Sequence, residues 1–146
     1  MSAVYRHPEV LASTEWLAEH LDDPTVRIVD LRYGVRADAD GTFRGASGID
    51  AYSEGHIPGA LFVDVLADLT DPDDPIPRNI LSPERFGALM GRLGVGDDTT
   101  VVVYDDRGGT WAARLWWALR YYGHDAVKLL NGGLTAWLAE SREIQT

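Results

Sequence analysis

Apolar residues occur along this chain in short, dense runs, separated by stretches in which they recur every three or four positions. The runs cover residues 26–31, 60–65, 100–104 and 127–130 and consist largely of Val, Ile and Leu. Runs of this length and composition are typical of strands in a sheet that is buried on both faces. The pattern therefore predicts four strands.

The intervening stretches have helical periodicity. Ser82 is predicted to cap a helix, because Pro83 suits the first helical position and apolar residues follow with helical spacing up to Gly94. After residues 105–110, one helical face collects Ala112, Leu115, Trp116 and Leu119. The predicted helices run from Ser13 or Thr14 to about Leu21, from Pro83 to Leu93, from about Ala112 to Tyr122, and over a short segment around Trp137.

Strands that alternate with helices indicate a mostly parallel sheet covered on both faces, which is a three-layer α/β/α arrangement. The length of 146 residues fits one domain, residues 1–146, that is large enough to bury a core. Residues 33–50 are rich in Gly, Asp and Ala and show no clear period. They are predicted to form a long surface loop, and loops of this length are either functional or disordered.

The charge of the chain restricts its partners. The formal net charge is −10, and Lys128 is the single lysine beside twelve arginines. Nucleic acids and anionic membranes both require a basic surface, so neither is expected as a partner.

The absence of cysteine restricts the chemistry further. A chain with no cysteine forms no disulfide, no thiolate metal site and no cysteine nucleophile. No cofactor and no metal are expected. The N-terminal segment has no apolar h-region, and no apolar run reaches the ~20 residues of a membrane span. We therefore expect a cytoplasmic location.

Several motifs are similar to those of the rhodanese family. Residues 52–60, YSEGHIPGA, match the family signature Y-x-x-G-H-I-P-G-A. Residues 29–32 resemble its first strand, which ends in Asp and Arg, and residues 130–137 resemble its closing G-G-x-x-x-W element. Residues 112–124 contain A-x-R-x-W-W-x-x-R-x-x-G-H, which resembles the first, non-catalytic domain of tandem two-domain rhodaneses. The resemblance covers roughly residues 10–138 and implies a rhodanese-like α/β fold.

The resemblance also implies that one domain of a two-domain protein carries the chemistry and the other does not. A complete tandem enzyme transfers sulfane sulfur from thiosulfate or 3-mercaptopyruvate to cyanide or a thiol acceptor, through a cysteine persulfide in its second domain. Asp105 stands where the family has that cysteine, so no catalytic residue and no turnover are expected in this chain alone. Residues 139–146 are expected to begin a linker to a second domain that this chain does not contain.

The loop that resembles the active site is predicted to be degenerate. It consists of Asp105, Asp106, Arg107, Gly108, Gly109 and Thr110. One like-charge pair ~5 Å apart costs roughly 3 kcal/mol at an effective dielectric of ~20, whereas a helix N-terminus offers an anion about 0.3–1 kcal/mol. The loop should therefore reject thiosulfate. We expect the Asp105 carboxylate to fold back and accept hydrogen bonds from the amides of residues 108–110.

By the same resemblance, the insertion at residues 33–50 leans toward the second domain. This implies an interface role for Tyr33, Arg36 and Phe43, and Trp117 is a further candidate on the outer helix face. An anionic sulfur donor needs positive groups around it. The candidates for a positively charged wall of the donor site are Arg32, Arg36 and Arg44. The expected partner is the second rhodanese domain, or a second copy of this chain bound through the exposed interdomain face.

Other functions remain open at this point. The chain could be a stand-alone, catalytically silent module that binds or regulates a protein. Asp105-Asp106 with Gly109-Thr110 is similar to the D-x-D-G-T motif of magnesium-dependent phosphatases, although the spacing differs by one residue. His56 and His124 could act as acid/base groups or metal ligands, but both lie within structural motifs and are expected to be packed or hydrogen-bonded.

Overall fold

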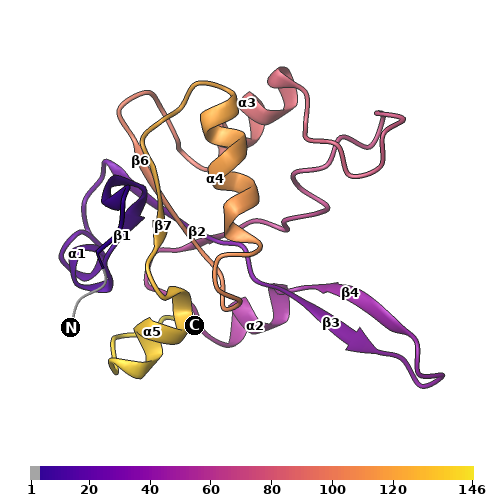
Figure 1. Cartoon of the computed structure of the whole chain (residues 1–146), viewed down its shortest axis with the longest axis horizontal. Coiled ribbons are helices and arrows are strands. Elements are labelled where there is room, and N and C mark those ends of the chain that lie inside the picture. The colour runs from indigo at the N-terminus through magenta and orange to yellow at the C-terminus, as the bar shows by residue number, and fades with distance from the viewer. Residues whose placement is uncertain (1–3) are drawn as a thin grey trace.

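The computed structural model describes residues 4–146, and its centre is a five-stranded parallel sheet. The strand order is β1-β7-β6-β2-β5, and each neighbouring pair is parallel. The strands are β1 (Leu11–Ala12), β2 (Val26–Asp30), β5 (Leu61–Phe62), β6 (Thr100–Tyr104) and β7 (Val127–Leu130). The predicted parallel sheet is confirmed, with β6 and β7 at their predicted bounds and β5 shorter than predicted (Figure 1). The fifth strand, β1, was not predicted.

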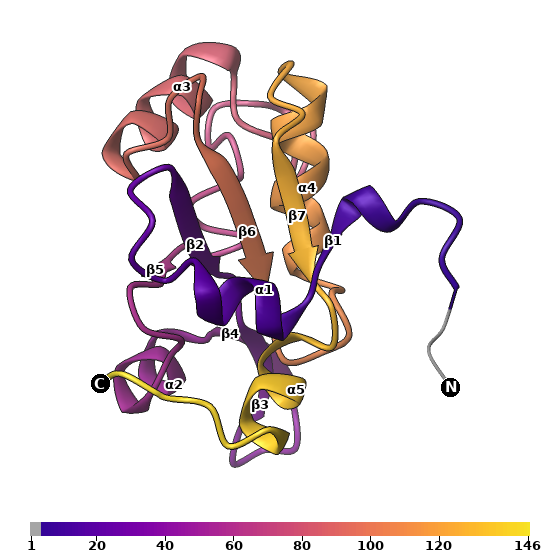
Figure 2. The ribbon, with the colours of Figure 1, turned by 90° about the vertical axis from the view of Figure 1, so that its left-hand side faces the viewer.

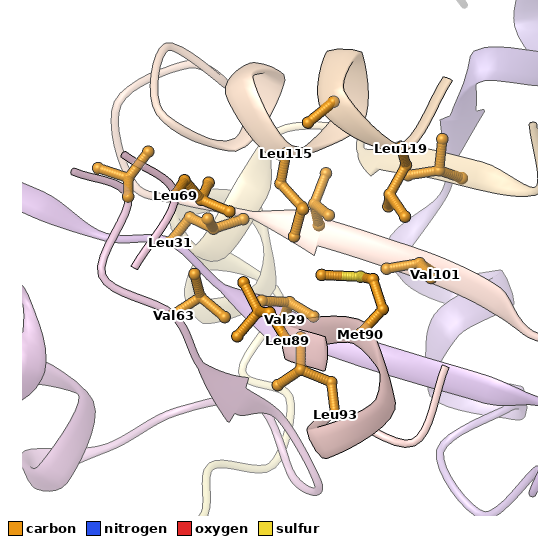
Figure 3. Packing of buried hydrophobic residues seen from close by; sticks show 14 of the residues in the cluster. Val29, Leu31, Val63, Leu69, Leu89, Met90, Leu93, Val101, Leu115 and Leu119 are labelled. Carbon is orange, nitrogen blue, oxygen red and sulfur yellow. The ribbon is translucent and has the colours of Figure 1, made fainter. Parts of the chain in front are cut away.

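Helices cover both faces of the sheet, as predicted. On one face, α3 (Pro83–Arg92) and α4 (Ala112–Tyr121) enclose a core that includes Leu89, Leu115 and Val101 (Figure 3). On the other face, α1 (Thr14–Glu19) and α5 (Gly133–Ala139) pack through Leu17 and Trp137 (Figure 2). A short 3-10 helix, η1 (Pro8–Val10), precedes β1.

Capping side chains fix the helix starts where the sequence indicated them. The hydroxyl of Ser82 accepts a hydrogen bond from the amide of Arg85, and Pro83 occupies the first turn of α3. The hydroxyl of Ser13 accepts a hydrogen bond from the amide of Trp16 and so caps α1. These caps satisfy amides that have no partner within the helix.

The prediction of a long loop at residues 33–50 is wrong. Strands β3 (Tyr33–Ala37) and β4 (Phe43–Ser47) form an antiparallel hairpin, and α2 (Ile49–Glu54) follows it directly. The hairpin projects from the body of the domain (Figure 1). Most of its residues are exposed, so the sequence lacks the alternation of apolar and polar residues that a half-buried strand requires.

The C-terminal segment packs against the domain. The backbones of His56 and Gln145 exchange two hydrogen bonds of 2.9 and 2.8 Å, and Ile144 joins the core beneath α5. The indole Nε1 of Trp137 donates to the carbonyl of Glu143 at 2.7 Å. Residues 143–145 are thus part of the fold, and the linker to a second domain stays a prediction. Within residues 4–146, no helix combines the length and apolar content that a membrane crossing requires.

Candidate functional site

The loop at residues 105–110 lies where the parallel strands end. It follows β6 and leads into α4, and the backbone carbonyl of Asp105 accepts a 2.9 Å hydrogen bond from the amide of Leu134 at the start of α5. The carboxyl edge of a parallel sheet, beside a helix N-terminus, is the usual position of binding sites in open α/β folds. Gly108 and Gly109 have φ values of 68° and 88°, a left-handed conformation that glycine adopts without strain.

The carboxylate of Asp105 fills this loop from within. Its Oδ1 accepts hydrogen bonds from the amides of Arg107 and Gly109 at 2.8 and 2.9 Å. Its Oδ2 accepts from the amides of Trp111 and Ala112 at 2.8 and 2.9 Å. Only 1% of the residue is exposed. The predicted folding back of Asp105 is confirmed.

The donors differ from the expected set. Of residues 108–110, only Gly109 donates to the carboxylate, and the amide of Thr110 turns toward the carbonyl of Arg107 instead. Arg107 donates from the loop itself, and the other two donors, Trp111 and Ala112, lie at the N-terminus of α4, where amides have no helical partner. Asp105 therefore also caps α4.

This arrangement leaves little room for chemistry at Asp105. Four amides use the acceptor positions of its two oxygens, so neither oxygen is free to attack a phosphate or to hold a metal. Asp106 is exposed beside it. Among residues 4–146, no three His, Asp or Glu side chains gather as a metal site. The geometry gives no support to the phosphatase alternative.

A buried polar network lies next to this loop. Asp30 is fully buried, and its Oδ2 accepts hydrogen bonds from the hydroxyl of Tyr104 at 2.7 Å and from Nε of Arg32 at 3.0 Å. The hydroxyl of Tyr104 accepts a hydrogen bond from the amide of Ile57. The network joins β2 and β6 to the segment after α2. Its residues were not predicted as a unit, although the Asp and Arg of residues 29–32 were the signal that could have located it.

The environment of this network shifts two pKa values. Burial, together with the neighbouring charge of Asp30, raises the pKa of Tyr104 far above its ordinary value, so the hydroxyl stays neutral. Burial alone would lower the pKa of Arg32, but its hydrogen bond to Asp30 and the charge of Asp30 outweigh burial and raise it. Both groups therefore keep one protonation state across the physiological range.

Arg32 lies apart from the other two candidate arginines, Arg36 and Arg44, which are cross-strand partners in the hairpin. The guanidinium of Arg32 turns inward to Asp30 and to the carbonyl of Gly55, at 2.7 Å. Arg36 is exposed and lies 4.0 Å from Asp50, while Nε of Arg44 lies 2.6 Å from Asp38 near the tip of the hairpin. Only part of the predicted wall is thus assembled in one place.

A groove of about 500 Å³ brings several predicted residues together. It lies between the hairpin, α2 and the degenerate loop, and Arg32, Tyr33, Arg36, Asp106 and Arg107 line it. Arg44 and Trp117 do not line this groove. Three guanidinium groups beside two carboxylates, those of Asp50 and Asp106, make its charge mixed rather than strongly basic.

Apolar side chains are exposed near this groove and on α4. Phe43 and Val35 of the hairpin are 73% and 61% exposed. On the outer face of α4, Trp117 is 47% exposed and stacks on Tyr121 with ring centroids 4.9 Å apart. Trp116 is half-buried against the core, as expected of a packing residue.

The two histidines of the motifs are packed and hydrogen-bonded, as predicted. Nδ1 of His56 lies 2.8 Å from the carbonyl of Tyr52, and the two rings stack with centroids 3.9 Å apart. Nε2 of His124 lies 2.8 Å from the carbonyl of Thr99.

Comparison with known proteins places these features in one family. The sequence profile of the rhodanese-like domain matches residues 13–140. The chain is 44% identical over 142 residues to the sulfur carrier protein TtuD of Thermus thermophilus. The aligned region covers 97% of this chain and 44% of that protein. It is 41% identical over 123 residues to 3-mercaptopyruvate sulfurtransferase of Escherichia coli, with 84% of this chain and 42% of that protein covered.

Solved structures agree with this comparison. The crystal structure of the 3-mercaptopyruvate sulfurtransferase SseA from Escherichia coli superposes with a TM-score of 0.79 at 37% identity, over 93% of this chain and 50% of that one. The enzyme from Leishmania major gives a TM-score of 0.77 at 27% identity, over 98% and 38% of the two chains. The chain spans half or less of the length of these relatives and corresponds to their N-terminal domain.

Proposed function

This chain belongs to the rhodanese-like domain family, and on that premise we propose that it is the N-terminal, non-catalytic half of a two-domain thiosulfate or 3-mercaptopyruvate sulfurtransferase. In the complete protein, a cysteine thiolate of the second domain attacks the outer sulfur of the donor. A new sulfur–sulfur bond forms while the S–S bond of thiosulfate or the C–S bond of 3-mercaptopyruvate breaks. Sulfite leaves in the first case, and in the second the enolate of pyruvate leaves and takes up a proton. Cyanide or a thiol then removes that sulfur and regenerates the thiolate.

The state of Asp105 carries this proposal. By the family resemblance Asp105 replaces the persulfide cysteine, and its carboxylate is bonded to the amides that would otherwise stabilise a sulfur anion. A carboxylate forms no persulfide, and the chain has no cysteine elsewhere. The loop is thus kept as structure, and the sulfur chemistry belongs to another domain.

The exposed hairpin indicates how this half takes part. A two-stranded hairpin is marginally stable by itself, and this one exposes Val35 and Phe43 to solvent. Because about two thirds of each residue is exposed, burial of both would stabilise an interface by about 2–4 kcal/mol. We propose that the second rhodanese domain covers this hairpin. Arg36, on the face opposite to Val35 and Phe43, and Arg107 both line the groove and would contribute positive charge near the anionic donor.

The coding sequence beyond Thr146 provides the first test. A downstream rhodanese domain whose loop begins with cysteine is the result expected for an enzyme half. In that full-length protein, Arg36→Ala should raise the KM for thiosulfate several-fold with little change in kcat. Arg92→Ala is the matched control, because it removes the same charge from the exposed end of α3. Equal KM values for the two variants would count against the proposed wall.

The alternative is a catalytically silent module that binds a protein partner. The exposed Trp117 and Tyr121 pair on α4, which lines no part of the groove, is the observation that favours it. A native stop codon near Thr146 would support this alternative and would remove the basis for the enzyme half.

A further inference from the structure

The hairpin of β3 and β4 is joined to the rest of the domain mainly at its base. Its two strands contact each other but make no extensive contact with another helix or strand of residues 4–146. At the base, the amide of Gly48 donates to the carbonyl of Arg32 at 3.1 Å, and the Arg32 side chain is anchored on Asp30. These bonds fix where the hairpin begins, but its two chain connections, both at the base, leave its angle undetermined.

The side chain of Tyr33 supplies the missing constraint. Tyr33 packs against the core cluster beneath α4, and its ring lies 5.0 Å from the ring of Trp111, tilted by 59°. Tilted aromatic pairs at this separation are favourable and directional. Trp111 is itself held in place, because its amide donates to the Asp105 carboxylate.

Gly45 makes room for this contact. Gly45 pairs with Val35, so it is a diagonal neighbour of Tyr33 on the same face of the hairpin. A Cβ atom added to Gly45 would lie 2.9 Å from Cε1 and Cζ of Tyr33 and nearer still to its hydroxyl. The Tyr33 ring therefore lies directly across the backbone of β4 and contacts both strands of the hairpin and the start of α4.

We propose that Tyr33 is a positioning residue that sets the angle of the hairpin, with Gly45 as the position that admits its ring and Trp111 as its support. The Tyr33 side chain thus acts within this domain rather than on a partner. One consequence rests on the proposed function: a second domain would meet a hairpin whose apolar face is already oriented, and less ordering would be needed on binding.

The chain offers matched variants for a test. Gly45→Ala should push the Tyr33 ring away from Trp111, whereas Gly34→Ala is the control, because a Cβ at Gly34 meets no atom within 4 Å. Neither glycine has a left-handed φ, so alanine fits both backbones. Tyr33→Leu removes the ring, and Tyr33→Phe keeps it without the hydroxyl.

The absence of cysteine permits a direct measurement of the angle. Thr42→Cys at the tip of the hairpin and Arg92→Cys on α3, both at exposed positions, give the only two sites for spin labels. Double electron–electron resonance then measures the distribution of distances between them. Urea unfolding of each variant shows whether the domain itself remains folded.

We expect a narrow distribution in the parent chain, in Gly34→Ala and in Tyr33→Phe, and a broad or displaced one in Gly45→Ala and Tyr33→Leu. In the Tyr33→Leu background, Gly45→Ala should add nothing further, because the clash is gone. Narrow distributions in both Gly45→Ala and Tyr33→Leu would overturn the inference, as would a broad one in the parent chain. This outcome is independent of sulfur transfer, which tests the proposed function.

Discussion

Replacing Asp105 with alanine removes the acceptor of four backbone hydrogen bonds at once. The carboxylate bonds the amides of Arg107, Gly109, Trp111 and Ala112 at 2.8–2.9 Å, and the residue is 1% exposed. Alanine leaves these amides without a partner and the first turn of α4 without its cap. The change therefore tests whether the degenerate loop contributes to folding.

The position of each amide determines the magnitude. Ala112 is fully buried, so its unpaired amide costs about 1–3 kcal/mol. The other three belong to exposed or half-buried residues whose amides can bond to water, at about 0.5 kcal/mol each. Loss of negative charge at the helix N-terminus adds about 0.3–1 kcal/mol. Together these give about 3–5 kcal/mol, or a fall in Tm of roughly 10–16 °C for a domain of this size.

Urea unfolding followed by tryptophan fluorescence measures the change, with Asp106→Ala as the matched control. Asp106 is an exposed neighbour of the same charge, and its loss should alter the free energy of unfolding by less than about 0.5 kcal/mol. If Asp105→Ala and Asp106→Ala lost equally little stability, the carboxylate would not organise this loop.

Three further predictions follow from the same contacts. Asp105→Cys should place a thiol beside the loop amides, which lower the pKa of that thiol below the ordinary ~8.5. Thiolate absorbance measured against pH would show this, and an ordinary pKa would contradict the view that these amides stabilise an anion. The raised pKa of Tyr104 contributes stability that is present below pH ~10 and lost as the pH rises above it. Tyr104→Phe should therefore be less stable at pH 7 but lose stability less steeply between pH ~9 and ~11. Equal slopes of the unfolding free energy against pH in the two proteins would refute this. Deleting residues 142–146 removes the pairing with His56 and the Ile144 contact and should cost about 2–4 kcal/mol in urea unfolding, whereas unchanged stability would mark the segment as a free linker.

The buried elements could be predicted because their sequences carry a period. Strands β6 and β7 are mostly apolar because helices cover both faces of the sheet. Helix α3 combines a capping serine, a proline at N1 and a stripe of buried apolar side chains. The hairpin could not be predicted in this way. Only Tyr33 packs against the core, and the outer positions of both strands face solvent, so no alternation marks them as strands.

The site was predictable in part. The sequence predicts free amides at the start of α4 and the Asp105 carboxylate beside them, because the loop joins a buried strand to an amphipathic helix. Which amides point at Asp105 depends on the left-handed backbone of Gly108 and Gly109, and glycine permits several conformations there. The inward turn of Arg32 likewise depends on a partner, Asp30, whose burial the sequence does not reveal.

The most direct test of the central claim is thiosulfate:cyanide sulfurtransfer by the purified 146-residue chain, measured as thiocyanate formed above a blank without protein. A chain without cysteine, whose loop after β6 is filled by a bonded carboxylate, should produce no thiocyanate above that blank. Turnover proportional to the protein concentration would contradict the account, because sulfur would then move without a protein thiol.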